Sequence, residues 1–231
     1  MNIRPGLREE VLRANRGLVE HGLVTLTWGN ASGIDRDSGL IAIKPSGVPY
    51  EDMVEDDIVV VDTTGRVIGG TRRPSTDTPT HLWLYRTFPE IGGIIHTHST
   101  WATSWAQAER EIPTFGTTHA DLCPGPIPVT RKLTPAEVRG EYEENTGAVL
   151  GEVIAGHGIE RVPGALVAGH GPFTWGETVA QALERAVSIE EVARMAFLTV
   201  MLRPDAAPVS AEVVDRHFGR KHGPGAYYGQ T

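Results

Sequence analysis

Cysteine is almost absent from the 231-residue chain, which carries only Cys123. One cysteine excludes an intramolecular disulfide framework and a cysteine-based zinc finger, and it is typical of a reducing compartment, so we expect a cytoplasmic protein. Long hydrophobic stretches are missing as well. Apolar runs such as Ile58–Val61 and Ala165–Ala168 fall far short of the roughly 20 residues that span a bilayer. The charged residues 1–15 lack the apolar core of a signal peptide.

An excess of basic charge is also lacking. The chain has 29 acidic and 21 basic residues and a net charge of −8, so we expect neither a nucleic acid nor a membrane as a partner. Any anionic ligand would need a local pocket. Hydrophobic residues make up 40% and charged residues 22%, as in ordinary globular proteins, and no repeat or linker interrupts the chain. We therefore expect a single domain that spans residues 1–231.

Helical and extended patterns alternate along the chain. The periodicity predicts helices at Leu7–His21, from Asp77 or Thr78 to about Phe88, and at Thr100–Ala108, Pro135–Ala155 and Glu177–Leu202. It predicts strands at Leu23–Leu26, Leu40–Ile43, Ile58–Asp62, Arg66–Ile68, Ile91–Thr97 and Leu166–Ala168. The tail after Pro204 is expected to be less regular. The alternation indicates an α/β or α+β fold with helices covering a sheet, although periodicity cannot give the strand order.

Three of the nine histidines follow short apolar stretches. His96 and His98 are two residues apart, and on a strand such residues project from one face. His170 lies between two glycines after another expected strand. Three imidazoles leave an open coordination position, which is the pattern of catalytic rather than structural metal sites. The spacing therefore predicts a metal site, with zinc as the leading candidate and cobalt, iron or manganese as alternatives.

Glycine-rich turns form a second group of candidates. Residues 28–33, 44–47 and 74–77 follow a strand or precede a helix, and they offer backbone N–H groups and small hydroxyls that can hold a phosphate. None of them matches the P-loop pattern, so each also fits an ordinary turn. Single residues that could exchange protons are scattered along the chain: Asp77, His119, Asp121 and Tyr228.

The order of the motifs is more specific than any one of them. The chain carries, in this order, the strings TLTWGNASG, IKPSGV, GTRRPSTDTPTH, IGGIIHTHS, GTTHAD, PVTRKLT, VAGHGPFTWG and AYYGQ. Together they resemble the L-ribulose-5-phosphate 4-epimerases and, more loosely, the wider class II aldolase and adducin-head superfamily. The resemblance implies a central, mainly antiparallel β-sheet flanked by helices, and a homotetramer with active sites between subunits.

The resemblance also implies roles for individual residues. The zinc ligands are matched by His96, His98 and His170. Asp77 matches an acidic position that either binds the metal or lies next to it. The two catalytic acid–base groups are matched by Asp121 and Tyr228. The substrate-phosphate pocket is matched by Gly29, Asn30, Ser46, Gly47, Ser75 and Thr76. In the tail, residues 204–231, His217 and Arg220 match positions that would reach a neighbouring subunit's site.

The implied reaction interconverts L-ribulose 5-phosphate and D-xylulose 5-phosphate. Carbon four is not next to the carbonyl, so simple deprotonation there finds no stabilised carbanion. Cleavage and re-formation of the bond between carbons three and four, with zinc as a Lewis acid, avoids this difficulty. An acid–base group is then needed on each face of the aldehyde fragment, and Asp121 and Tyr228 would supply the pair. Nothing in this chemistry requires an organic cofactor.

Two other functions stay open. A class II aldolase of the L-fuculose-1-phosphate type shares the three histidines, but it usually has Glu where this chain has Asp77. A non-enzymatic module of the adducin-head type is disfavoured, because a scaffold has no need of an open metal site. Release of a free aldehyde distinguishes the aldolase from the epimerase, and metal analysis tests the scaffold.

Overall fold

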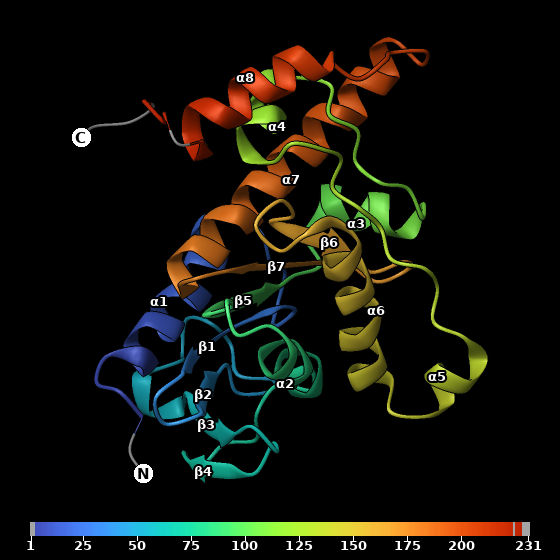
Figure 1. The fold of residues 1–231 in the computed structure, drawn as a ribbon. Coiled ribbons are helices and arrows are strands. Elements are labelled where there is room, and N and C mark those ends of the chain that lie inside the picture. The colour runs from blue at the N-terminus through green and yellow to red at the C-terminus, as the bar shows by residue number, and fades with distance from the viewer. Residues whose placement is uncertain (1–2, 224, 228–231) are drawn as a thin grey trace.

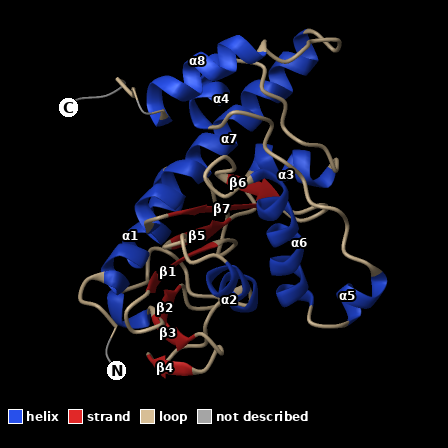
Figure 2. Ribbon diagram, in the orientation of Figure 1, coloured by secondary structure: helices blue, strands red, loops and turns tan. Residues whose placement is uncertain are grey.

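A seven-stranded sheet organises the computed structural model, which describes residues 3–223 and 225–227. The strand order is β4-β3-β2-β1-β5-β7-β6, and each neighbouring pair is antiparallel (Figures 1 and 2). The strands are β1 (Asn30–Asp35), β2 (Leu40–Ile43), β3 (Val59–Asp62), β4 (Val67–Gly69), β5 (Gly93–His96), β6 (Gly164–Leu166) and β7 (Pro172–Gly176). The expected antiparallel sheet flanked by helices is thus confirmed.

Helices surround this sheet. They are α1 (Leu7–Glu20), the short 3-10 helix η1 (Glu55–Asp57), α2 (Thr78–Thr87), α3 (Thr100–Gln107), α4 (Thr117–Leu122), α5 (Pro135–Arg139), α6 (Tyr142–His157), α7 (Val179–Leu202) and α8 (Ala211–His222). The helices expected near the N-terminus and at residues 78–88, 100–108 and 177–202 are confirmed to within about two residues.

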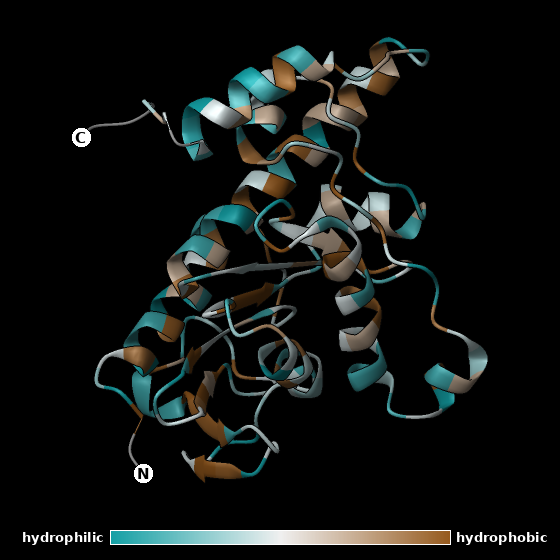
Figure 3. Cartoon of the chain, in the orientation of Figure 1, coloured by the Kyte–Doolittle hydropathy of each residue, from teal (hydrophilic) through white to brown (hydrophobic). Residues whose placement is uncertain are grey.

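Helices cover both faces of the sheet, because successive strand residues point to opposite sides. On β5, Ile94 packs into a core with α2 and α6, whereas Ile95 packs into a core with α1 and the start of α7. A third cluster joins α3 to the later part of α7 and to Leu166 of β6. Figure 3 shows β3, β4 and β5 in the colours of hydrophobic residues. Strands β1, β2 and β5 are buried along their whole length.

The first strand begins later than its sequence pattern predicts. Leu23–Leu26 is a loop, not a strand, and Leu26 has a positive φ of 53°. Strand β1 is formed instead by NASGID, whose composition favours a glycine-rich turn. A Cβ on Gly33 would lie 2.6 Å from a methyl of Val179 and 2.9 Å from one of Leu7. Small residues are therefore required here by the close approach of α1 and α7, and that packing overrides the turn-like composition.

Other segments also differ from expectation. Strand β6 ends at Leu166 rather than at Ala168, and β7 has no counterpart among the expected strands. The tail contains a regular helix, α8, that was not predicted. Val214 is its only buried residue, so the sequence of α8 shows little of the hydrophobic periodicity that marks a helix. The segment around Asp121 forms the short helix α4, for which no helix was predicted.

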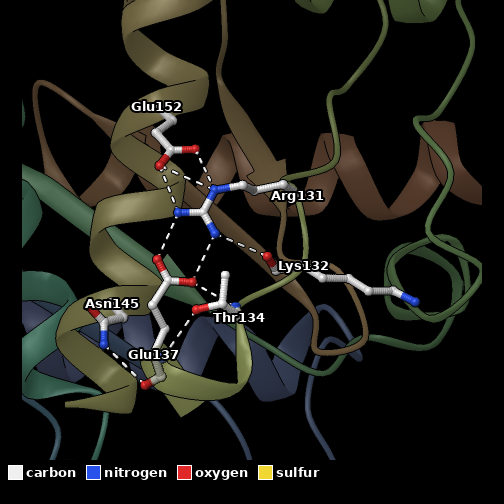
Figure 4. Close-up of polar contacts among 6 residues, drawn as sticks. All are labelled: Arg131, Lys132, Thr134, Glu137, Asn145 and Glu152. Carbon is white, nitrogen blue, oxygen red and sulfur yellow. Dashed lines mark hydrogen bonds and ion pairs between the residues drawn. The ribbon is translucent and has the colours of Figure 1, made fainter. Parts of the chain in front are cut away.

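The expected helix at residues 135–155 is divided into α5 and α6. Arg131 joins the two, as Figure 4 shows. Its guanidinium donates hydrogen bonds of 2.8 and 2.9 Å to Glu137 on α5 and of 2.9 Å to Glu152 on α6. These hydrogen bonds tie α5 to the later part of α6, whose first residue, Tyr142, lines the candidate pocket.

Candidate active site

Three histidines meet at one end of the central strands. His96 is the last residue of β5, and His98 follows two residues later. His170 lies in the tight turn between β6 and β7, next to Gly169, whose φ of 72° allows the turn. Ligand nitrogens of the three rings all lie within 4.8 Å of one another. The structure therefore brings the three predicted metal ligands together.

The state of the rings fits a metal ion. The Nδ1 atom of His96 lies 3.0 Å from the carbonyl oxygen of Pro172, so Nδ1–H donates there and Nε2 keeps a free lone pair. Burial, together with the neighbouring His96 and His98, lowers the pKa of His170 to about 3. Its Nδ1 atom is buried without a hydrogen-bond partner among the described residues. Neutral imidazoles with unengaged nitrogens are the form that binds a divalent cation.

Asp77 faces the same site from the beginning of α2. It occupies the N-cap position of that helix without a side-chain capping hydrogen bond, and its Oδ2 atom accepts a hydrogen bond of 2.6 Å from the side-chain amide of Asn30. Burial works against ionisation of Asp77, but the nearby His96 and His81 outweigh it, so the pKa lies below the usual aspartate value. An ionised carboxylate beside three imidazoles strengthens the case for a cation.

A pocket of about 410 Å³ adjoins the histidines. Besides the three histidines and Tyr142, three segments of the chain line it, and they include each predicted phosphate-pocket residue together with Asp77: Gly29, Asn30, Ser46, Gly47, Ser75, Thr76 and Asp77. Hydrogen bonds tie two of these segments together, because Asn30 also donates to Ser75 Oγ at 3.1 Å. Turns that indicate no binding site when each is taken alone thus line one pocket in the folded chain.

Lys44 is a pocket residue that the sequence analysis did not single out. Its side chain is 2% exposed, and its Nζ atom lies 3.1 Å from the carbonyl oxygen of Val48 and 4.7 Å from the ring centre of Tyr50. No described carboxylate pairs with it. Desolvation lowers its pKa to about 8. The one available signal was a lysine that ends the otherwise apolar stretch LIAI, where a buried cation needs a partner.

Two aromatic residues also line the pocket and were not predicted. Trp28 is 52% exposed, and its ring centre lies 6.5 Å from that of His98. Tyr142, the first residue of α6, has its ring centre 6.3 Å from that of His170. They flank the histidine cluster from different elements, so both can contact a ligand there.

Asp121, His217 and Arg220 form a different cluster. Asp121 on α4 accepts hydrogen bonds from His217 Nδ1 at 3.0 Å and from Arg220 Nε at 2.9 Å, both on α8. Burial raises the pKa of Asp121, but these two donors more than compensate and keep it ionised. Asp121 does not line the histidine pocket, and α4 and α8 lie at the top of Figure 1, away from α2 and β1. Tyr228 lies outside the described residues.

The fold and site define the class: an antiparallel sheet that gathers three imidazoles and a carboxylate beside a polar pocket, suited to a divalent metal ion and a small ligand. The chain belongs to the class II aldolase and adducin N-terminal domain family, whose model matches residues 9–197. Among residues 3–223 and 225–227, every helix is too short or too polar to cross a bilayer.

Solved structures with the same fold include several aldolases. An L-fuculose 1-phosphate aldolase is 26% identical, with 94% of this chain and 96% of that chain covered and a TM-score of 0.81. YgbL from Escherichia coli, whose reaction is described only as aldolase, epimerase or decarboxylase, is 23% identical, with 92% and 98% covered and a TM-score of 0.71. L-fuculose-1-phosphate aldolase from Thermus thermophilus is 22% identical, with 90% and 100% covered and a TM-score of 0.69. At these identities the last two support the fold alone.

Proposed function

We propose that the protein is a zinc-dependent L-ribulose-5-phosphate 4-epimerase. The observation that carries the proposal is that one pocket combines the three-histidine cluster with Lys44 and hydroxyl-bearing turns. The histidines suit a metal ion that a ketose can chelate, and the buried cation suits a phosphate. Within the family, the strings GTTHAD and YYGQ, similar to those of the epimerases, favour this member.

The phosphate end of the substrate would lie against Lys44. The side chains of Ser46, Ser75 and Thr76 line the same pocket and can donate hydrogen bonds to phosphate oxygens. A phosphate there would give the desolvated ammonium of Lys44 the anionic partner that its described neighbours do not provide. Tight binding of the phosphate keeps the cleaved aldehyde fragment in the site while the fragment rotates to present its other face.

The reaction follows from the position of carbon four. A bound divalent cation would supply Lewis-acid chemistry, drawing negative charge onto the substrate oxygens near carbons two and three. As the bond between carbons three and four breaks, its electron pair stays with the carbon-three fragment and the carbon-four hydroxyl gives up its proton. The aldehyde then presents its other face, the bond re-forms, and the new alkoxide takes a proton. Asp121 and Tyr228 are the proposed acid–base pair, one for each face.

We propose that this pair acts from a neighbouring subunit of a homotetramer. Asp121 lies outside its own chain's histidine pocket, so it needs a second chain to reach substrate. Helix α4, which carries Asp121, contacts α7, and the end of α7 exposes apolar side chains: Met195, Phe197, Leu198, Met201 and Leu202. A second copy would cover them and bring α4 and α8 to its pocket, where His217 and Arg220 would also act.

A sugar-phosphate aldolase is the second candidate, because the solved relative at 26% identity carries that name. The aldolase would need the same metal site and phosphate grip, but it would release both fragments. Retention of the aldehyde distinguishes the two activities. The contrast therefore lies in the products rather than in the residues of the pocket.

The test is a product assay on the metal-loaded protein with L-ribulose 5-phosphate. We expect D-xylulose 5-phosphate to accumulate, with little free glycolaldehyde phosphate. Because a positioned acid–base is worth about 10²–10⁴-fold in rate, Asp121→Asn should lose at least about 10²-fold in turnover while its metal content is unchanged. Stoichiometric release of the aldehyde would favour the aldolase, and no conversion of any sugar phosphate would refute both proposals.

A further inference from the structure

A buried tyrosine contacts two of the segments that line the candidate pocket, and it has no role in the proposed reaction. Tyr50, in the loop between β2 and η1, is 3% exposed and is not among the described residues that line the pocket. The chain reverses after Lys44, at Gly47 with its φ of 69°, and Tyr50 returns to the side chain of Lys44. Tyr50 can therefore act on a ligand only through the residues that it contacts.

The ring of Tyr50 contacts the ammonium of Lys44. The Nζ atom lies over the ring, 4.7 Å from its centre, which is within the range of a cation–π interaction. The carbonyl oxygens of Pro45 and Val48 accept hydrogen bonds of 3.3 and 3.1 Å from the same Nζ atom. The ring and the two carbonyls are neutral partners. They fix the position of the ammonium without neutralising its charge, which stays available to an anionic ligand.

The hydroxyl of Tyr50 contacts a different segment of the pocket. Burial raises the pKa of Tyr50, so the hydroxyl keeps its proton and acts as a donor. It donates a hydrogen bond of 2.8 Å to the carbonyl oxygen of Gly29, and the carbonyl oxygen of Trp28 lies 3.2 Å away. Gly29 packs closely on β5, because a Cβ there would lie 2.9 Å from the carbonyl oxygen of His96. One side chain therefore joins the loop after Lys44 to the turn at Gly29.

We propose that Tyr50 is a positioning residue for the phosphate of the substrate: its ring holds the Lys44 ammonium and its hydroxyl holds the turn at Gly29, so that both segments are in place before a ligand binds. Groups that are already ordered lose less conformational entropy on binding, which strengthens affinity. The inference rests on the phosphate pocket of the proposed function. It does not depend on whether the sugar phosphate is epimerised or cleaved.

Binding of inorganic phosphate to the zinc-loaded protein is the main test, measured by titration calorimetry. Tyr50→Leu removes the ring and the hydroxyl, so the phosphate Kd should rise at least about fivefold, the factor that corresponds to the loss of one cation–π contact of moderate strength. Tyr50→Phe keeps the ring and should raise Kd by a smaller factor, about threefold for one hydrogen bond. In a Lys44→Met background the two variants should differ by less than about twofold, because the ring acts through Lys44.

The titration of Lys44 separates the two contacts. The lysines of the chain are Lys44, Lys132 and Lys221, so 13C-lysine labelling and comparison with Lys44→Met assign the Lys44 signal. Its pKa in the wild type is about 8. Tyr50→Phe should leave this pKa unchanged, because the ring stays. Tyr50→Leu should lower it, because the ring no longer stabilises the charged form.

Tyr85→Phe is the matched control. Tyr85 is also buried, its hydroxyl lies 2.8 Å from Ser32 Oγ, and the guanidinium of Arg36 lies over its ring at 5.6 Å. These residues are not among those that line the pocket. The phosphate Kd and the Lys44 pKa of this variant should equal those of the wild type even if its stability falls. If Tyr50→Leu does not fold, the phosphate Kd of Tyr50→Phe decides.

Two kinds of failure can be told apart. Wild-type phosphate affinity in Lys44→Met would overturn the phosphate pocket and this proposal with it. Weakened binding in Lys44→Met, together with wild-type affinity in the Tyr50 variants, would overturn the role of Tyr50 alone. A Lys44 pKa that Tyr50→Leu leaves unchanged would do the same.

Discussion

Lys44 is a cation whose described neighbours supply carbonyl oxygens and an aromatic ring but no carboxylate. Desolvation alone lowers its pKa to about 8, so Lys44 of the free protein is mostly protonated at pH 7 and loses its proton as the pH rises through about 8. Burial of an unpaired ammonium costs stability, and such a residue persists where a ligand supplies the missing charge. Its placement among Ser46 and Ser75 makes phosphate the fitting ligand.

The first prediction concerns the pH dependence that Lys44 imposes. A sugar phosphate is a dianion above about pH 6, and Lys44 is protonated below its pKa of about 8. We expect kcat/KM to fall as pH rises through this value, because kcat/KM reports groups of the free enzyme. Lys44→Met should raise KM at pH 7 and remove this alkaline limb. A wild-type profile that stays level to pH 9 would contradict the assignment.

The second prediction concerns the metal ligands. His98→Asn removes one imidazole from a cluster of three, so zinc content after dialysis should fall at least tenfold, an estimate based on typical losses at metal sites. Turnover should fall with it, and chelation of the wild type should reproduce the loss. His157→Asn, an exposed histidine at the end of α6, is the control and should keep its metal. Full turnover by metal-free His98→Asn would end the Lewis-acid mechanism.

At the residue scale, patterns that depend on local spacing were predictable. His96 and His98 are two apart on an extended segment, and the structure brings them to His170 as expected. Lys44 and Tyr142 were not predicted, because their roles come from burial and from the approach of α6, which spacing does not encode. The resemblance implied a catalytic role for Asp121. The structure describes the position of this residue, and its catalytic role stays a prediction.

At the scale of elements, helices α1, α2, α3 and α7 and strands β2 and β5 were predictable, whereas strands β1 and β7 and the start of α6 were not. The caps and proline at residues 77–79 and the uninterrupted pattern of α7 are local signals. Strand β1 is rich in small residues because α1 and α7 pack on it, and β7 contains proline and two aromatics rather than an alternating pattern. Both strands belong to the sheet through long-range pairing with β5.

The third prediction tests the packing of β5 against α7. A Cβ on Gly93 would lie 2.5 Å from Val179 Cα and 2.6 Å from Val179 N, which are backbone atoms that cannot turn aside. We expect Gly93→Ala to lower the free energy of unfolding by about 1–3 kcal/mol and to weaken metal binding, since β5 carries His96. Gly125→Ala, where nothing lies within 4 Å of the added carbon, should be neutral. Urea denaturation of both variants measures the difference. Equal denaturation midpoints would contradict the prediction.

At the scale of the whole molecule, the chain divides its candidate groups between two regions. The histidines, Asp77 and Lys44 share one pocket, whereas Asp121 is held by His217 and Arg220 where α4 meets α8. Composition and periodicity gave no indication of this separation, because α8 is polar and buries little. An arrangement of this kind is productive when a second copy supplies the missing groups.

The last prediction tests such sharing by complementation. Removal of residues 205–231 deletes α8, which buries only Val214, so the shortened chain should fold and bind zinc but not turn over. His98→Asn keeps its tail and lacks the metal. If the tail acts on a neighbouring pocket, random mixing in a ring gives a good pocket beside a good tail in roughly a quarter of the sites, so about that share of wild-type turnover should return. Native mass spectrometry shows whether mixed assemblies have formed. Mixed assemblies without activity, or an active shortened chain, would show that the tail does not complete a neighbour's site.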